Sequence, residues 1–298
     1  MNNWILDRYK KLNNDFEFTE CQLKQSFRIN PLLSNEKEVL NSLKKQKVIL
    51  EKIPFLDKAY WYEAPFSLAS SPEYLMGKIY IQEAASQLPP LVLLKTWTKN
   101  SKILDMCAAP GSKTTQMAEI TNDEIPIVAL DSNQQRLQPL KNNIERLKLK
   151  SIVTYRKDSR FAHDLEIKFT HILLDAPCSG NYCVEKNFFT LRSIDGILER
   201  SKLQKELLRA AYKSLDKKGI LVYSTCSLEP EEDELMIEWF IQTYPDMKLI
   251  DTELTIGDEG LTKVFETTLN SSLKLTRRFW PYKTETEGFF IAKLQKQN

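Results

Sequence analysis

Short apolar runs alternate with amphipathic segments from Ser101 onward, and this alternation constrains the fold more than any other feature of the chain. The apolar runs lack polar–apolar alternation, as expected for parallel strands buried on both faces. The segments between them repeat apolar residues at spacings of three and four, which is typical of helices packed on a sheet. This order predicts an α/β fold with a Rossmann-like, doubly wound parallel sheet and right-handed crossovers. The expected strands are 101–107, 125–131, 151–158, 170–177 and 219–226, and the expected helices are 112–120, 133–149, 197–218 and 231–244.

The two ends of the chain depart from this alternation. Towards the C-terminus, segments 273–281 and 287–294 predict a closing hairpin. Towards the N-terminus, two expected helices, around 3–12 and 35–46, precede a stretch of turn-forming prolines and aromatic residues. The predicted division is therefore a small N-terminal α/β appendage over residues 1–75, with its boundary near Ser70–Pro72, and a sheet domain over residues 76–298.

Composition and charge limit the classes of function. The chain has 298 residues, of which 42% are hydrophobic and 28% charged, as in a globular protein with a sizeable core. The net charge is only +2, so nucleic-acid binding would need a local basic patch. No apolar run approaches the roughly 20 residues that cross a bilayer, and the N-terminus lacks a signal-peptide pattern, so we expect a cytoplasmic protein without membrane contact. Five widely spaced cysteines, two histidines and no CxxC pair argue against a disulfide framework and a metal site.

Three of the expected strands end in residues suited to a nucleoside cofactor, which in such sheets binds beyond the carboxyl ends of the strands. The first strand runs into the loop 105–113, DMCAAPGSK, whose small residues and Gly111 leave room for a ligand. This loop matches neither GxGxxG nor a P-loop. Asp131 follows Gly111 by 20 residues, the spacing at which a carboxylate meets ribose hydroxyls. Asp158 ends the third strand and could accept from an exocyclic amine. A tight turn and two helix N-caps are the alternatives, but the combination predicts an adenosine-like cofactor.

Two cysteines end the next two strands. Cys178 follows Asp175-Ala-Pro, and Cys226 ends the run YSTC. A single cysteine in such a place is most often a core residue. Two cysteines at the ends of consecutive strands should meet at one edge of the sheet, facing the cofactor, and we therefore interpret them as functional.

Three motifs together resemble those of RNA cytosine-5 methyltransferases of the NOL1/NOP2/Sun family: DMCAAPGSKTTQ (105–116), DAPCSGN (175–181) and YSTCSLEPEEDE (223–234). The resemblance extends over about 27–294, from FRIN (27–30) to a C-terminal segment, RRFWPYKTETEGFFIAKL. The compact length and the lack of an added RNA-binding domain are similar to archaeal tRNA cytosine-5 methyltransferases. The sequence departs from the family pattern at Ser112, Asp233, Tyr282 and the extra thiol Cys183.

The resemblance implies S-adenosylmethionine as cofactor and assigns roles to residues. Cys226 would be the nucleophile that adds to C6 of cytosine, and Cys178 would assist product release, as a base or as a residue that positions the base. Pro177-Cys178 also resembles the nucleophile motif of DNA cytosine-5 enzymes, so the swapped assignment stays open. Asp175 could hold the amino edge of cytosine, in protonated form if it donates to N3. Lys113, the sulfonium of the cofactor or a helix N-terminus could activate the thiol. The expected cofactor-binding residues are Cys107, Ala108, Ala109, Pro110, Gly111, Ser112, Lys113, Asp131, Arg136, Asp158 and Asp175.

The expected substrate is tRNA, with rRNA as the alternative and a non-catalytic RNA-binding assembly protein as the rival from another class. We expect the appendage over 1–75 to hold RNA, and KLTRRFWPYK (274–283) combines cations with aromatic rings that could contact it. Lys186 stands where the family often has a basic residue. The acids of 231–234 fit the positive end of a helix that begins after Pro230. Resemblance to archaeal members implies a monomer and a small partner such as archease.

Overall fold

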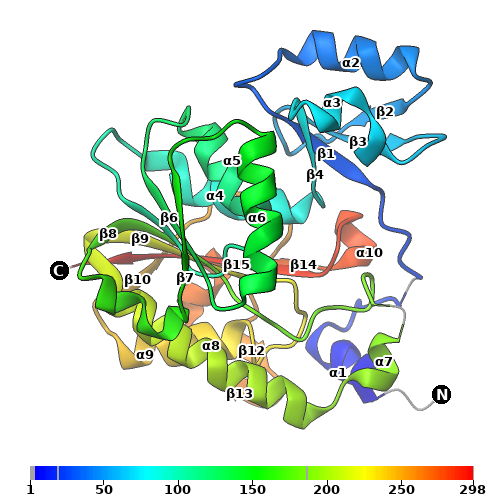
Figure 1. Ribbon diagram of the computed structural model, residues 1–298. Coiled ribbons are helices and arrows are strands. Elements are labelled where there is room, and N and C mark those ends of the chain that lie inside the picture. Colours follow the sequence, from blue (N-terminus) through cyan, green and yellow to red (C-terminus); the bar gives the residue numbers. More distant parts are fainter. Residues whose placement is uncertain (1–3, 19, 186, 298) are drawn as a thin grey trace.

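A mixed sheet forms the centre of the protein. The computed structural model describes residues 4–18, 20–185 and 187–297. Five parallel strands lie in the order β9-β8-β5-β6-β7 (Figure 1). Antiparallel strands extend the β9 edge: β15 pairs with β9, and both β14 and β10 pair with β15. The bounds are β5 Ile103–Asp105, β6 Ile127–Asp131, β7 Ile152–Arg156, β8 Phe169–Asp175, β9 Leu215–Thr225, β10 Met247–Ile250, β11 Asp258–Glu259, β14 Arg277–Phe279 and β15 Phe289–Lys296. The predicted doubly wound sheet and closing hairpin are confirmed.

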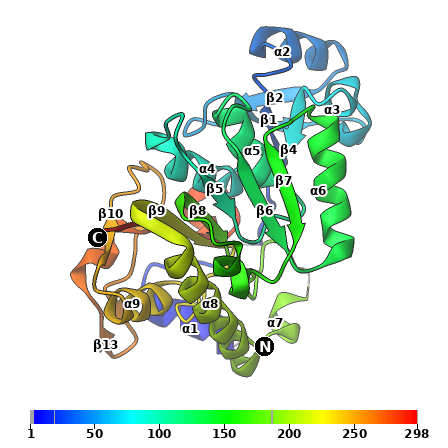
Figure 2. The same ribbon diagram turned by 60° about the vertical axis from the view of Figure 1, so that its left-hand side comes forward.

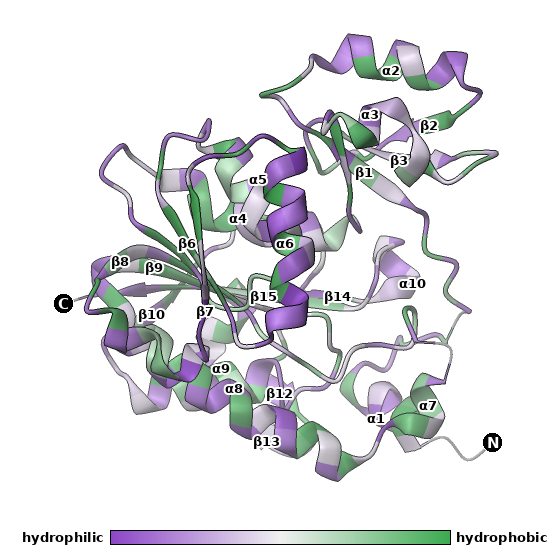
Figure 3. Cartoon of the chain, in the orientation of Figure 1, coloured by the Kyte–Doolittle hydropathy of each residue, from purple (hydrophilic) through white to green (hydrophobic). Residues whose placement is uncertain are grey.

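Helices cover both faces of this sheet (Figures 1 and 2). Residues of one strand alternate between the two cores, because successive side chains point to opposite faces. Leu104, Ile172 and Leu221 join the core under α8 and α9, whereas Leu173 and Val222 join the core under α4 and α5. Figure 3 shows the central strands as predominantly hydrophobic ribbons and α6 as largely hydrophilic. The helices are α4 Leu88–Leu93, α5 Ser112–Ile120, α6 Gln134–Arg146, α7 Phe188–Leu191, α8 Ile194–Ser214, α9 Glu234–Thr243 and α10 Pro281–Thr284.

A second, antiparallel sheet forms most of the N-terminal part, in the order β2-β3-β1-β4. It has its own apolar core, which includes Phe27, Val39 and Tyr60. Arg28 of β1 fixes this sheet to the large domain: its guanidinium lies 2.9 Å from a carboxylate oxygen of Glu119 in α5. The bounds are α1 Trp4–Leu12, β1 Ser26–Ile29, α2 Glu36–Lys45, β2 Ile49–Lys52, β3 Ala59–Glu63, α3 Pro72–Leu75 and β4 Ile79–Ile81.

The first helix does not belong to the small sheet. Ile5, Tyr9 and Leu12 of α1 are buried in the core under α8 and α9 of the large domain. At the other end of the predicted appendage, the last strand of the small sheet, β4, lies beyond residue 75. The two parts of the structure therefore interleave along the chain.

One expectation about the cysteines is wrong. Cys21 and Cys183 form a disulfide, although 162 positions separate them in the sequence. Folding brings the segment after α1 against the loop that follows Cys178, and spacing along a chain does not reveal such a contact. Cys107, Cys178 and Cys226 are free thiols. Within the described residues, no helix has the length and apolarity needed to cross a membrane.

Candidate active site

The free thiols of Cys178 and Cys226 lie together at the carboxyl edge of the sheet. Strands β8 and β9 are parallel neighbours, with Asp175 opposite Ser224. The sulfur atoms of Cys178 and Cys226 are 3.0 Å apart, within hydrogen-bonding distance. The hydrogen bond to Cys226, together with burial, raises the pKa of Cys178 well above its ordinary value. Cys178 therefore favours the protonated thiol form.

Lys113 and Asp175 form an ion pair beside the thiols. The Lys113 Nζ atom lies 2.7 Å from an Asp175 carboxylate oxygen and donates to Ser86 Oγ at 2.9 Å. Ser224 Oγ donates to the other Asp175 oxygen at 2.7 Å. Burial alone would lower the pKa of Lys113, but the charge and hydrogen bond of Asp175 outweigh it and raise that pKa. The site thus holds a fixed positive charge close to Cys226.

A pocket of about 440 Å³ opens along the ends of the parallel strands, and the two thiols form one side of it. Asp131 accepts from the backbone N–H of Asn133 at 2.9 Å through Oδ1. Its Oδ2 lies 3.7 Å from an Arg136 nitrogen, and none of the described residues donates a hydrogen bond to it, so this oxygen can receive a ribose hydroxyl. Asp158 accepts from Arg160. The predicted cofactor residues in the pocket wall are Cys107, Ala109, Asp131, Arg136, Asp158 and Asp175.

The other predicted cofactor residues belong to the loop after β5 but lie outside the pocket wall. Gly111 has a left-handed backbone, with φ of 105°. A Cβ atom at this position would come within 2.6 Å of the Leu140 side chain in α6. The need for glycine therefore comes from packing of α6, in addition to the room for a ligand that the sequence suggested. Among the described residues of the loop, Ala108, Pro110, Gly111, Ser112 and Lys113 do not line the pocket.

The acids after Cys226 are not charges on an exposed helix start, and that interpretation is wrong. Helix α9 begins at Glu234, and the preceding residues form turns. Glu229, Glu232, Asp233 and Glu234 are all 0% exposed. Each is engaged by another part of the chain, because a buried carboxylate requires donors or a cation.

Two elements supply partners for three of these acids. Arg278 of β14 lies 3.1 Å from an Asp233 oxygen and also pairs with Glu234. Tyr9 of α1 donates to Glu229 at 2.9 Å. Within the segment 274–283, which was expected to contact RNA, Arg278 and Trp280 are buried and so cannot do so. Lys186, the other predicted basic contact, lies outside the described residues.

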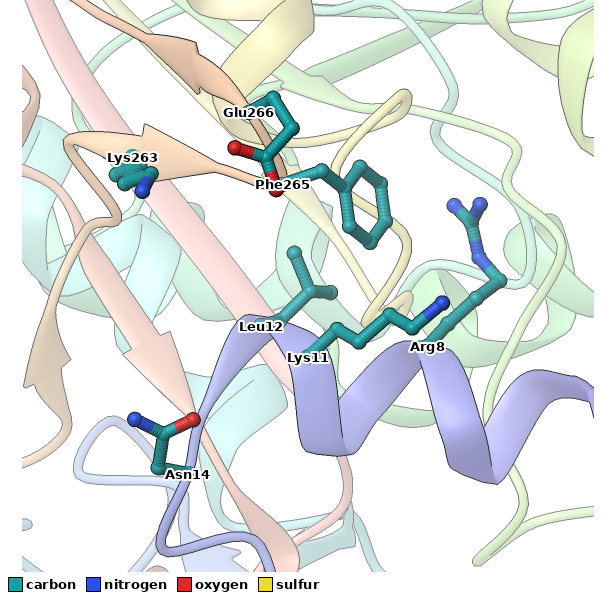
Figure 4. Close-up of a pocket in the computed structure, with 7 residues that line it drawn as sticks. All are labelled: Arg8, Lys11, Leu12, Asn14, Lys263, Phe265 and Glu266. Carbon is teal, nitrogen blue, oxygen red and sulfur yellow. The ribbon is translucent and has the colours of Figure 1, made fainter.

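A second pocket, of about 720 Å³, separates α1 from the hairpin of β12 (Lys263–Val264) and β13 (Thr267–Thr268) (Figure 4). Arg8 and Lys11 reach into it from α1, and Phe265 faces them from the hairpin. The Arg8 guanidinium lies 4.9 Å from the Phe265 ring centroid and 2.7 Å from a Glu231 oxygen. Arg8 therefore contacts both the hairpin and Glu231.

Asn181 is a buried site residue that sequence reasoning passed over. Its side-chain amide donates to the Cys226 carbonyl at 2.9 Å and to the Gly288 carbonyl at 3.2 Å. Asn181 is part of the DAPCSGN motif, so its place three residues after Cys178 was the available signal. Glu287 lies beside it with a pKa raised well above its ordinary value, mainly by burial and then by the charge of Glu83.

The fold and the site define a Rossmann-like methyltransferase with two thiols beside its cofactor pocket. Residues 92–295 match the family described as 16S rRNA methyltransferase RsmB/F, and residues 1–84 match the N-terminal domain of 16S rRNA methyltransferase RsmF. The chain belongs to this RsmB/F (NOL1/NOP2/Sun) family of S-adenosylmethionine-dependent RNA cytosine-C5 methyltransferases. The acceptor oxygens of the pocket fit the ribose hydroxyls and the adenine amino group of that cofactor.

Two relatives are similar to the chain at the same level of identity. The tRNA (cytosine(49)-C(5))-methyltransferase of Pyrococcus abyssi is 37% identical over 304 residues, covering 99% of this chain and 96% of the relative. The 25S rRNA (cytosine-C(5))-methyltransferase nop2 of Schizosaccharomyces pombe is 37% identical over 290 residues, covering 94% of this chain and 47% of the relative. The chain thus spans about half the length of the fission-yeast relative.

Solved structures share the fold. A methyltransferase homolog protein from Pyrococcus horikoshii has a TM-score of 0.87 and 35% identity, covering 98% of this chain and 94% of its own. The structure of NSun6 from Pyrococcus horikoshii with SFG has a TM-score of 0.82 at 24% identity, covering 100% and 96%. The latter likeness concerns the fold alone.

Proposed function

We propose that this chain methylates C5 of cytosine in tRNA, with Cys226 as the nucleophile and Cys178 as the residue that assists release. The observation that carries the proposal is the pair of sulfur atoms 3.0 Å apart at the rim of the cofactor pocket. A structural cysteine pair would have no need to lie on a pocket whose wall carries Asp131, Asp158 and Asp175.

The residues divide the chemistry as follows. The Cys226 thiolate adds to C6 of cytosine, which makes C5 nucleophilic. S-adenosylmethionine, when bound, supplies the methyl group that C5 takes up. A base then removes the C5 proton, the C5–C6 double bond re-forms and the Cys226 thiolate leaves. Cys178 lies in contact with Cys226, so it is placed to assist this release.

The charges of Lys113 and Asp175 bear on the same assignment of roles. Lys113 is held as a cation close to Cys226, because the charge and hydrogen bond of Asp175 raise its pKa. Both Asp175 oxygens already accept hydrogen bonds, from Lys113 and from Ser224. This favours Asp175 as an acceptor for the cytosine amino group over the predicted donor role at N3.

Full-length similarity to the Pyrococcus abyssi enzyme supports tRNA as the substrate. Ribosomal RNA is the second candidate, because the fission-yeast relative that is named for rRNA is equally identical. The roles predicted for residues 1–75 in holding RNA and for an archease-like partner belong to this proposal. The near-complete coverage of the tRNA enzyme, against half of the rRNA enzyme, is what favours tRNA.

A trapped-adduct experiment tests the assignment. Labelled tRNA and rRNA fragments are incubated with S-adenosylmethionine and the wild type, Cys178→Ala, Cys226→Ala or the double variant, and separated on a denaturing gel. We expect a protein–tRNA band with Cys178→Ala that is absent from both proteins lacking Cys226. A band with rRNA alone would mean that rRNA, and not tRNA, is the substrate. A band with Cys226→Ala would swap the two roles, and the absence of both methyl transfer and an adduct with every protein, the wild type included, would support the non-catalytic rival.

A further inference from the structure

The two thiol-bearing loops hold each other through two buried side chains. Glu232 lies on the loop after Cys226, and its two carboxylate oxygens accept from the Ser179 backbone N–H at 3.0 and 3.1 Å. Ser179 immediately follows Cys178. In the reverse direction, Asn181 of the Cys178 loop donates to the Cys226 carbonyl at 2.9 Å. Each thiol is therefore flanked by a bond from the other loop.

The other contacts of Glu232 also converge on Cys178. Ser179 Oγ donates to the carboxylate at 2.5 Å. Gln204 of α8 donates to Glu232 at 3.1 Å and to the Pro177 carbonyl at 3.0 Å. Both neighbours of Cys178, Pro177 and Ser179, are thus tied to one carboxylate, either directly or through Gln204.

Glu232 has no compensating cation. It is 0% exposed, and among the described residues no lysine or arginine forms a salt bridge with it, in contrast to Asp233 and Glu234 beside Arg278. Burying a carboxyl group without a cation is costly, and burial raises the pKa of Glu232. An acid that only stabilised the fold would be better placed next to a cation. Glu232 instead lies where its carboxylate oxygens accept from the backbone N–H of Ser179 and fix that backbone.

We propose that Glu232 is a positioning residue that sets the distance between Cys178 and Cys226, with Asn181 as its counterpart on the opposite loop. Without Glu232 the backbone N–H of Ser179 would lose its acceptors, and the Cys178 loop could move away from Cys226. The thiol that assists release would then no longer contact the nucleophile. The last consequence depends on the proposed function, but the distance between the thiols does not.

The first experiment measures that distance without RNA. Diamide oxidises two adjacent thiols to a disulfide and takes up their two hydrogens. The reduced full-length protein is treated with diamide, and the Cys178–Cys226 disulfide is followed by peptide mass spectrometry. Because effective concentration falls steeply with misplacement, we expect the Glu232→Ala rate to fall by about tenfold. Glu231→Gln, which alters the neighbouring acid that contacts Arg8, is the matched control and should keep the wild-type rate.

The second experiment measures release. Glu232→Ala should accumulate the Cys226-dependent RNA adduct by roughly tenfold over wild type, as expected when a group needed for elimination is displaced. General damage to the fold would lower adduct formation, so a gain cannot come from instability. Glu232→Gln keeps one acceptor for the Ser179 N–H and should lie between the alanine variant and wild type in both assays. It also serves if the alanine variant does not fold.

Unchanged oxidation rates in folded Glu232→Ala and Glu232→Gln would overturn the inference. A slower oxidation rate without adduct gain would keep Glu232 as the residue that sets the thiol distance and remove its effect on release. If Cys178→Ala itself traps no RNA, the proposed function fails, whereas the oxidation rate still decides the role of Glu232.

Discussion

The catalytic edge of the sheet has two halves that use acidic residues in opposite ways. At the ends of β6 and β7, Asp131 and Asp158 line the cofactor pocket. Beyond the end of β9, Glu229, Glu232, Asp233 and Glu234 are fully buried and do not line that pocket. An acid on a pocket wall can be reached by a ligand, whereas a fully buried acid bonds only to other parts of the chain and holds them in place. We call the ends of β6 and β7 the cofactor half and the region beyond β9 the thiol half. Mutations in the cofactor half should weaken cofactor binding. Mutations in the thiol half should displace the thiols or lower the free energy of unfolding.

The largest effect is expected at Cys226 itself. Cys226→Ala should lower methyl transfer by roughly 10⁴-fold or more, because the covalent step has no substitute. Its thermal midpoint should stay close to that of the wild type, since the side chain is only partly buried. Radiolabelled methyl incorporation and thermal melting measure the two properties separately. Retained transfer would show that the thiol half does not carry the chemistry.

Next in size is the loss of the buried cation of the thiol half. Arg278→Met leaves Asp233 and Glu234 without their cation, and breaking a buried pair in this way costs about 3–5 kcal/mol of the free energy of unfolding. Burial already raises the pKa of Asp233 well above its ordinary value with Arg278 in place. Urea unfolding measures the change.

The neighbouring residue provides a matched control. Arg277 of β14 is partly exposed, and its guanidinium donates only to backbone carbonyls. Arg277→Met should cost less than about 1 kcal/mol, as is typical of a partly exposed position. Equal losses in the two variants would mean that the paired acids of the thiol half are not a special source of stability.

The cofactor half should respond in binding. Asp131→Asn removes a charged acceptor from the pocket and should weaken the binding of S-adenosylhomocysteine by about 10–100-fold, the equivalent of one charged hydrogen bond. Isothermal titration calorimetry measures this, with Asp195→Asn on the exposed start of α8 as control. If Asp131→Asn instead unfolds the protein while leaving affinity unchanged in the folded fraction, the contrast between the two halves breaks down.

Some features of these two halves could be predicted from the sequence, and others could not. The strands, their parallel direction and the meeting of the two thiols could be predicted. Apolar periodicity is local, and parallel strands end at one edge of the sheet. The burial of the acids after Cys226 could not, because their partners are distant: Arg8 precedes Glu231 by 223 positions, and Arg278 follows Asp233 by 45. A run of acids after a proline has the same appearance whether it starts an exposed helix or enters a core.

The smallest expected effect concerns pH and a residue away from the site. His171 of β8 is buried, and burial, with Lys293 nearby, lowers its pKa to about 4. The unfolded chain takes up that proton near pH 6.5 and the folded chain only near pH 4, so acid favours unfolding. The free energy of unfolding should fall as pH decreases through this window, by roughly 1–2 kcal/mol from this group. His171→Gln should flatten that part of the curve in urea unfolding measured from pH 7 to pH 4.5.

The same titration separates the sheet from its catalytic edge. His171 lies near the start of the strand that ends at Asp175, opposite Ile103 and Ile220 and away from the thiols. His171→Gln should therefore alter stability in acid without shifting the pH dependence of methyl transfer by the folded enzyme. A shift in that pH profile would mean that the buried scaffold and the catalytic edge are electrostatically coupled. It would then be incorrect to treat the acids that hold the backbone as separate from the groups that do the chemistry.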